Sequence, residues 1–386
     1  SYCKFENKST LISENAKFKA DIFETMQGEY PSSITLYDSE FSGKFNIQHS
    51  NAKLNIHIEN CIYDEEFSIY ECKNVQTVFV VNSYFNKTLY ISNNIIKDLN
   101  ISQLEIKELS VLGGNNIKKL FCSNVTFQNF ISFRKNVFES DVNLSNVNFL
   151  KKVSFIDSVI KGSFNLRDTL FYDEAHFIDI SKYEDKLIPV TVDNRETARK
   201  IKDSFEQQNN IIEANRYYAA EMKEREKELE VTRSKNWFEW LIFKVQEVSS
   251  NHSQDALLAL FWICVVGVFA SYFSFYTIQD KMGNYVHFNI LPFIATMALS
   301  VAIVGSKYIF KTLEKIDYYF VFVFFPLLYY YTTNDSWFTL FANTINPFSI
   351  MTKGETLNLG MLIFKVIIAY LIYQFIVSVR QNTRRK

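Results

Sequence analysis

The chain contains 386 residues, a length that corresponds to about two to three domains of ordinary size. Its 41 basic and 42 acidic side chains nearly cancel, which argues against a globally basic nucleic-acid-binding protein. Most of these charges precede residue 255, and long apolar runs between Asp255 and Val379 exclude a purely soluble globular protein. The 37 Phe and 22 Tyr residues require extensive burial.

Residues 1–29 precede the clear repeats and are predicted to form an N-terminal cap. The opening segment, Ser1 to Lys8, lacks the apolar stretch of a secretory signal, so we expect it to remain cytosolic. The five cysteines form no C-x-x-C pair, and an odd count fits a reducing compartment better than a disulfide framework.

A repeat of eleven residues organises the segment 30–190. The set Phe127, Ile131 and Phe133 is typical, with apolar residues at offsets 0, 4 and 6. The spacing slips by about one residue twice between Ile95 and Asn116. Comparable sets begin at positions 30, 41, 52, 63, 74, 85, 95, 105, 116, 127, 138, 149, 160 and 171.

The internal spacing of each set indicates strands rather than helices. Offsets 0 and 4 share one face of a helix, but offset 6 falls on the far side. Offsets 4 and 6 alternate as they do in a strand, and the residues are β-branched or aromatic. The polar residues between the sets are those that turns favour. The pattern therefore predicts a parallel β-solenoid, whose coils bury their inward rows only by stacking on one another.

A finer pattern lies within the repeat. Large inward residues recur at alternating gaps of six and five, as at Phe127 and Phe133, with smaller residues such as Val125 and Ile131 two positions earlier. Over roughly residues 30–180 this pattern resembles the bacterial pentapeptide-repeat proteins, in a degenerate form. The resemblance implies a right-handed quadrilateral β-helix of about seven coils, roughly 34 Å long.

The sequence offers no signature of an enzyme. It contains no Walker loop, no G-x-S-x-G, no H-E-x-x-H and no Rossmann glycines, and its 10 Gly residues leave little room for phosphate-binding loops. The histidines have no partners at metal-ligand spacing, while Cys61 and Cys72 occupy small inward positions of the repeat, as core thiols would. We predict a non-enzymatic protein without a metal or cofactor.

Some pentapeptide-repeat proteins mimic DNA and act on a topoisomerase, so the charge of the solenoid bears on its partners. Residues 1–190 carry 20 basic and 24 acidic side chains. This excess is too small for a phosphate mimic, because duplex DNA carries about one charge per 1.7 Å. We predict no nucleic-acid partner.

Residues 191–250 are predicted to form a helical linker. Asp193 and Glu196 have the spacing of a capping box, with Asp193 as N-cap of a helix that should end near Gln208. After a turn, a second helix with an apolar stripe and a densely charged face should run to Thr232.

The stretch that follows, residues 237–245, combines Trp237 and Trp240 with other aromatic residues and a lysine. Trp at this density beside a membrane segment is typical of a helix that lies in the headgroup region. We predict an interfacial helix anchored in the lipid bilayer by both Trp residues. Basic residues of the tail serve as further membrane-interface anchors: Arg380, Arg384 and Arg385.

Residues 251–386 are predicted to be a transmembrane domain of about four helices, at 256–278, 286–304, 316–331 and 359–379. Four spans leave both termini on one side. Lys and Arg gather in the connection between the second and third spans and in the C-terminal tail. The positive-inside rule then places the solenoid and both termini in the cytosol, at the inner (cytoplasmic) membrane of a bacterium.

Lys365 is an ionisable residue inside the last predicted span, where charge is expensive and commonly functional. One interpretation is that its ammonium snorkels to the outer interface. The other is that Lys365 lines an inter-subunit pore or site together with Tyr370, Tyr373 and Gln374.

The segment 337–350 is too short and too polar to cross a membrane, yet too aromatic for an ordinary loop. It either lies on the outer surface or re-enters the membrane. In the second case Asn343, Asn346 and Pro347 would line a water-filled vestibule.

Two functions are compatible with this organisation. The first is a homo-oligomeric, channel-like pore whose cytosolic solenoid serves as sensor or vestibule, and this is the function that the pattern favours. The alternative is a membrane-tethered scaffold whose solenoid binds a cytosolic protein partner. Spans with polar interruptions bury little surface in a monomer, so we expect self-association in both cases. No Thr-Val-Gly-Tyr-Gly-like filter is present, and potassium selectivity of that kind is not expected.

Overall fold

The computed structural model describes residues 2–6, 10–19, 32–183, 188–281, 333–349 and 359–383, with single residues between 294 and 330. They belong to two compact units, Ser1–Arg225 and Glu226–Lys386, which are described here one at a time.

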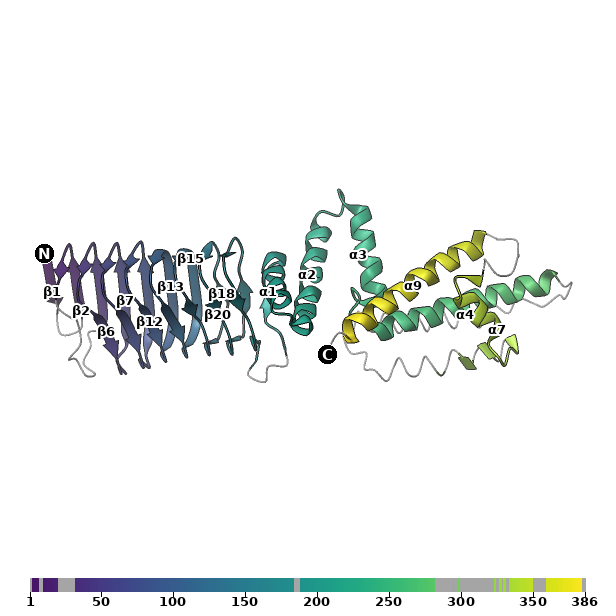
Figure 1. Ribbon diagram of the computed structural model, residues 1–386, viewed down its shortest axis with the longest axis horizontal. Helices are drawn as coiled ribbons and strands as arrows, with labels where there is room; N and C mark the ends of the chain where they lie inside the picture. Colours follow the sequence, from purple (N-terminus) through teal and green to yellow (C-terminus); the bar gives the residue numbers. More distant parts are fainter. Residues whose placement is uncertain are drawn as a thin grey trace. The chain divides into compact units, whose positions relative to one another are not determined.

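The first unit is a β-solenoid of about seven turns, drawn as a stack of strands in Figure 1. The predicted β-solenoid is thereby confirmed. One side is a seven-stranded parallel sheet in the order β24-β20-β16-β14-β12-β9-β6, and the other strands form an eighteen-stranded sheet. The strands of the two sheets together are β1 (Tyr2–Glu6), β2 (Thr10–Glu14), β3 (Lys17–Phe18), β4 (Ser33–Tyr37), β5 (Glu40–Phe41), β6 (Phe45–Gln48), β7 (Leu54–Glu59), β8 (Ile62–Tyr63), β9 (Phe67–Tyr70), β10 (Val75–Val81), β11 (Tyr84–Phe85), β12 (Leu89–Ser92), β13 (Ile95–Ile106), β14 (Ser110–Gly113), β15 (Asn116–Phe127), β16 (Ile131–Ser132), β17 (Val137–Phe138), β18 (Val142–Asn143), β19 (Val147–Phe149), β20 (Val153–Ser154), β21 (Val159–Ile160), β22 (Ser163–Asn165), β23 (Leu170–Phe171), β24 (Ala175–His176) and β25 (Thr191–Val192).

The segment 1–29, expected to be a cap, contributes strands to the solenoid. β2 and β3 pair in parallel with β4 and β5, as the later coils do with one another. β1 instead pairs antiparallel with β2 and so covers the first edge of the stack. Covering an edge strand removes a template for pairing between molecules.

Corners with a left-handed backbone explain the eleven-residue period. Positive φ angles recur at intervals of ten or eleven residues, from 47° at Asp38 to 70° at Gly114. Only Gly, and to a lesser degree Asn and Asp, adopt this conformation at low cost, which favours these residues between the apolar sets. The corner residues are Asp38, His49, Asn60, Glu71, Asn82, Asn93, Gln103, Gly114, Asn124, Lys135, Asn146, Asp157, Asp168 and Asp179.

Two intervals between corners are shortened, and the first of them matches the slip between the sets that begin at positions 95 and 105. Asn93 is followed by a corner at Gln103, and Gly114 by one at Asn124, each ten residues later. In both places a single long strand, β13 or β15, runs straight through the corner. Gly114 suits this corner because its φ is 70°, and a Cβ at this position would also lie 2.3 Å from Oδ1 of Asn93.

The inward residues form ring stacks that follow the solenoid axis. The rings of Phe133, Phe155 and Phe177 are parallel to within 6°, with centroids 4.8 and 5.2 Å apart. Phe127, Phe149 and Phe171 form a second stack. The predicted core thiols of Cys61, Cys72 and Cys122 are fully buried, and burial raises the pKa of Cys61 to about 11.

Helix α1 (Arg195–Gln207) closes the far end of the solenoid (Figure 1). Its Thr197, Ala198, Ile201 and Phe205 are buried against the last coil, and α2 (Ile211–Val231) follows after a turn. The predicted helix limits are confirmed to within a residue, but the capping box at Asp193 was wrong.

The N-cap is Asn194, whose side chain accepts a hydrogen bond from the Thr197 N–H at 2.9 Å. Glu196 serves the solenoid instead, because it accepts a hydrogen bond from the backbone N–H of Asp168 at 3.0 Å. The carboxylate that a capping box would have used for the helix therefore accepts a backbone N–H from the last coil of the solenoid instead.

The second unit contains α3 (Trp237–Ser250), α4 (Ala256–Lys281), α7 (Thr339–Ile345) and α9 (Leu359–Thr383). Within the described residues, α4 and α9 are long and apolar enough to cross a membrane. The predicted spans 286–304 and 316–331 lie outside the described residues apart from single positions, as do Arg384 and Arg385 entirely.

Candidate functional site in the C-terminal unit

Helices α4 and α9 form an antiparallel pair. Near one end, Gln254 Nε2 donates a hydrogen bond to Gln381 Oε1 at 3.1 Å, just before the first residue of α4. Near the other end, the rings of Phe273 and Phe364 lie 6.4 Å apart. The buried face of α9 repeats every three or four residues, as a helix packed on one side requires: Ile368, Leu371, Gln374 and Ser378.

The ammonium of Lys365 is bound to the C-terminal end of α7. Its Nζ donates to the carbonyl oxygens of Asn343 (2.6 Å), Thr344 (2.9 Å) and Asn346 (2.6 Å). A fourth oxygen, the hydroxyl of Ser349, lies 2.8 Å away. The last carbonyls of a helix have no partner within the helix and carry partial negative charge, which a cation stabilises.

Short helix α7 lies against the middle of α4 at two small residues. A Cβ on Gly267 would come within 2.8 Å of the Phe341 ring, so only glycine permits this approach. One turn further on, the hydroxyls of Ser271 and Thr344 form a buried hydrogen bond of 3.3 Å. Small residues four apart let helices approach closely in an apolar setting.

The predicted vestibule residues are placed beside the Lys365 ammonium. Asn343 and Asn346 supply backbone oxygens to it, while their side chains are exposed. The Asn346 side chain turns back to accept a hydrogen bond from the Phe348 N–H at 3.0 Å. Pro347, the next residue in the chain, is half-buried. The structure therefore brings three of the predicted residues, Lys365, Asn343 and Asn346, into one polar cluster.

The other residues predicted to act with Lys365 lie elsewhere on α9. The Oε1 atom of Gln374 accepts hydrogen bonds from the hydroxyls of Ser250 (3.0 Å) and Ser253 (2.9 Å). The hydroxyl of Tyr370 lies 3.4 Å from that of Ser249. These contacts hold α9 to the turn between α3 and α4, where residues 251–253 are all left-handed. Tyr373 is 61 % exposed and belongs to neither cluster.

Sequence reasoning missed Ser349, Thr344, Gly267 and Ser271. The last two could have been found, because Gly-x-x-x-Ser in an apolar run is a known signal for close helix contact. Ser349 and Thr344 had no such signal, since only the fold brings them to Lys365 and to α4.

Helix α3 presents an apolar face, with Trp237 63 % exposed and Phe238, Leu241, Ile242 and Val245 on the same side. Trp240 is half-buried beneath the guanidinium of Arg233, which lies 4.1 Å from the ring centroid. Lys244 binds Glu226 and Glu247, and although its partial burial opposes the charge, these bonds raise its pKa. Arg380 lies in the last turn of α9.

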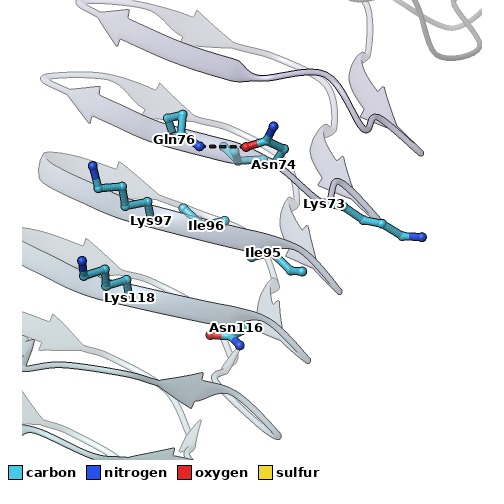
Figure 2. A pocket seen from close by; sticks show the side chains of 9 residues that line it. Lys73, Asn74, Gln76, Ile95, Ile96, Lys97, Asn116 and Lys118 are labelled. Carbon is cyan, nitrogen blue, oxygen red and sulfur yellow. Dashed lines mark hydrogen bonds between the residues drawn. The ribbon is translucent and has the colours of Figure 1, made fainter.

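The solenoid surface carries a shallow pocket, shown in Figure 2. Lys97 and Lys118 extend in the same direction from successive coils, and Gln76 Nε2 donates to Asn74 Oδ1 at 2.8 Å beside them. Elsewhere, opposite charges face each other across coils, as in Lys161–Glu139 (2.7 Å). Other lining residues are Lys73, Val75, Ile95, Ile96 and Asn116.

Among the described residues no three His, Cys, Asp or Glu side chains gather as metal ligands do. The chain matches no known family model, no curated protein and no solved structure in the comparisons made.

Proposed function

We propose that this protein is a homo-oligomeric, channel-like pore of the bacterial cytoplasmic membrane. In this proposal α4 and α9 cross the bilayer, with the predicted spans 286–304 and 316–331 between them. The solenoid, a degenerate right-handed quadrilateral β-helix of the pentapeptide-repeat kind, lies in the cytosol as sensor or vestibule.

The contact of α7 with Gly267, near the middle of α4, is the observation that carries the proposal. Gly267 follows the first residue of α4 by eleven positions, or about 17 Å at 1.5 Å per residue. That is about half of a ~30 Å hydrocarbon core. A helix that rests on Gly267 therefore lies near the centre of the bilayer if α4 spans it, as a re-entrant segment would.

Polar groups at that depth cannot face lipid. The side chains of Asn343 and Asn346 are exposed within one chain, and the backbone of residues 346–348 is not helical. Such backbone is tolerated at membrane depth only where protein buries it or water fills a cavity. A water-filled path between subunits satisfies both amides.

The outer face of α9 supports self-association. Its described residues are apolar and exposed, while the buried face holds the polar Gln374 and Ser378. This apolar face can contact lipid or a second copy of the chain. Its exposed residues are Leu359, Leu362, Ile363, Val366, Ile367 and Ile376.

Planar-bilayer recording tests the proposal directly. Purified protein should give discrete unitary currents, and Asn346→Ala, which removes an amide from the path, should change their amplitude. Ile363→Val, on the apolar face, is a control with similar loss of volume. Averaged images of the detergent-solubilised particle should show rotational symmetry. Silent bilayers after verified insertion, with a monomeric particle, would contradict the pore.

The tethered scaffold remains a second candidate because of an apolar row on the solenoid. Ile62 and Tyr84 face each other across successive coils and are 37 % and 47 % exposed. Exposed apolar neighbours of this kind are typical of protein-binding surfaces. Silent bilayers together with saturable binding of a cytosolic protein, abolished by Tyr84→Ser, would establish this function instead.

A further inference from the structure

The oxygens around Lys365 have the arrangement of an ion site. Four oxygens lie 2.6–2.9 Å from one nitrogen, and all come from the short stretch 343–349. An ammonium has only three protons to donate. The number and similar distances of the oxygens therefore resemble coordination of a spherical cation, as when carbonyl oxygens replace the hydration shell of a monovalent ion.

The oxygen set is organised by its own segment rather than by Lys365. The Ser349 hydroxyl donates to the Asn343 carbonyl at 3.0 Å, and the Ser349 N–H donates to the Asn346 carbonyl at 3.3 Å. The C-terminal end of α7 adds the negative end of its dipole. These contacts do not involve Lys365, so we expect the oxygens to stay together when its side chain is changed.

We infer that these four oxygens form a monovalent-cation site that Lys365 fills from within the chain, and that the filled site makes the pore select anions. The selectivity rests on the proposed function. All four oxygens are neutral, so none of them cancels the positive charge of the ammonium. In a symmetric oligomer each subunit places one such charge at the same depth, and a ring of positive charge favours anions over cations.

Reversal potentials in a potassium chloride gradient test the selectivity. The reversal potential of wild-type currents should be shifted from zero towards the equilibrium potential of chloride. Lys365→Gln keeps amide donors for the oxygens but removes the charge, and Lys365→Met removes both. Both variants should shift the reversal potential towards the equilibrium potential of potassium, and Lys365→Met should shift it further than Lys365→Gln. Wild-type currents that prefer potassium, or variants without any shift, would overturn the anion selectivity.

Thallium(I) binding in detergent tests the oxygen site without any need for conduction. Lys365→Met should bind about one thallium ion per chain, whereas wild type and Lys365→Gln keep the site occupied and should not. Adding Ser349→Ala to Lys365→Met should weaken binding by up to about tenfold, because one of four oxygens is lost. Potassium should compete with thallium.

The two experiments separate the two claims. Silent bilayers would remove the pore, and with it the anion selectivity, while thallium binding would still establish the oxygen site. Lys365→Met that elutes at the wild-type position yet binds no thallium would overturn the site. Should Lys365→Met aggregate, thallium binding by Lys365→Ala of wild-type elution takes its place with the same outcomes.

Discussion

Left-handed corner residues set the local demands of the solenoid. Most corners from Asp38 to Asp179 hold Asn, Asp or Gly, but four depart from this preference: His49, Glu71, Gln103 and Lys135. A longer side chain gains nothing from the left-handed backbone and bears its steric cost. Such corners are positions where the natural sequence is not at its stability optimum.

We expect Lys135→Asn to raise the free energy of unfolding by about 0.5–1 kcal/mol, because φ is 57° at this corner. Denaturant melting of the full chain in detergent, followed by far-UV circular dichroism, measures the change. Lys151→Asn, at an exposed position outside the positive-φ corners, is the matched control. Equal effects of the two substitutions would show that backbone conformation is not the cause.

The hydroxyl of Tyr63 lies in the apolar core of the solenoid. Its ring stacks between Phe41 and Phe85 at 4.6 and 4.9 Å and is fully buried. Among the described residues its hydroxyl has no hydrogen-bond partner, and burial raises its pKa well above the ordinary value. An unsatisfied buried hydroxyl destabilises the folded state.

Tyr63→Phe should therefore raise the free energy of unfolding by about 1 kcal/mol, since it removes the hydroxyl and keeps the ring stack. Tyr84→Phe removes a hydroxyl at a 47 % exposed position and should change stability little. Thermal melts of both variants beside wild type provide the comparison. A less stable Tyr63→Phe protein would mean that a water molecule satisfies the hydroxyl.

Neighbouring coils place side chains in columns along the solenoid, and the signs of the charges in a column affect the stability of the sheet. Lys97 and Lys118 lie between the registered pairs Ile96–Ile117 and Asp98–Lys119, so the two like charges face each other. In the next coil of that column Glu139 is bound to Lys161 at 2.7 Å. Like charges directly opposite one another destabilise a sheet.

Lys97→Glu should create an attractive pair with Lys118 and raise the free energy of unfolding by about 0.3–1 kcal/mol. The gain should shrink at high salt, which screens exposed charges. Lys87→Glu is the control with the opposite sign, because Lys87 lies between Glu65 and Glu108 when the strand register is continued. Denaturant melts at low and high salt measure both, and a destabilising Lys97→Glu would contradict the column argument.

The contact between α1 and α2 depends on a buried carboxylate. Glu221 accepts hydrogen bonds from Arg199 and Lys202, each at 2.9 Å. Burial alone would raise the pKa of Glu221, but these two partners lower it below its ordinary value of 4.5. A lowered folded-state pKa adds stability above the unfolded-state pKa and loses it as the pH falls through the folded-state value.

Protection of the α1–α2 segment should therefore weaken as the pH drops below about 4.5. Glu221→Gln should flatten the pH dependence, and it should destabilise the segment at neutral pH because the charge of the carboxylate is lost. The expected loss is about 1–2 kcal/mol, a moderate value because the partners of Glu221 are partly exposed to solvent. Protease sensitivity of the linker across the pH range is the measurement. Glu65→Gln, at an exposed site on the solenoid, should leave the profile unchanged.

At the scale of the whole molecule, the antiparallel arrangement of α4 and α9 bears on the proposed membrane topology. Gln254 and Gln381 are in contact at 3.1 Å, so the chain entering α4 and the chain leaving α9 lie at the same end of the pair. An even number of crossings follows if both helices span the bilayer. The predicted four spans satisfy this condition.

Single cysteines at positions 254 and 381 should therefore react with a membrane-impermeant maleimide from the same side. Inverted vesicles should label both Gln254→Cys and Gln381→Cys, and right-side-out vesicles neither, if that side is the cytosol. The wild-type protein measures background from its own thiols, of which Cys61, Cys72 and Cys122 are buried. Labelling of the two variants from opposite sides would contradict the antiparallel pair.

The solenoid and the two long apolar helices were predictable from sequence because their determinants are local and periodic. The inward rows recur every eleven residues, and the slip between the sets that begin at positions 95 and 105 matches strand β13, which runs through a corner. The apolar length of α4 and α9 is likewise a property of consecutive residues. The N-cap was misplaced by one residue because the last coil of the solenoid competes for Glu196.

The surroundings of Lys365 were decided by tertiary structure alone. Its oxygen partners lie 16 to 22 residues away, at no helical or strand spacing from it. The oxygens lie near Lys365 because α7 packs on Gly267 of α4, and this contact positions the end of α7 beside α9. The sequence identifies Lys365 as a charge that is costly inside an apolar helix. The groups that stabilise this charge are determined by packing, which joins segments that share no local pattern.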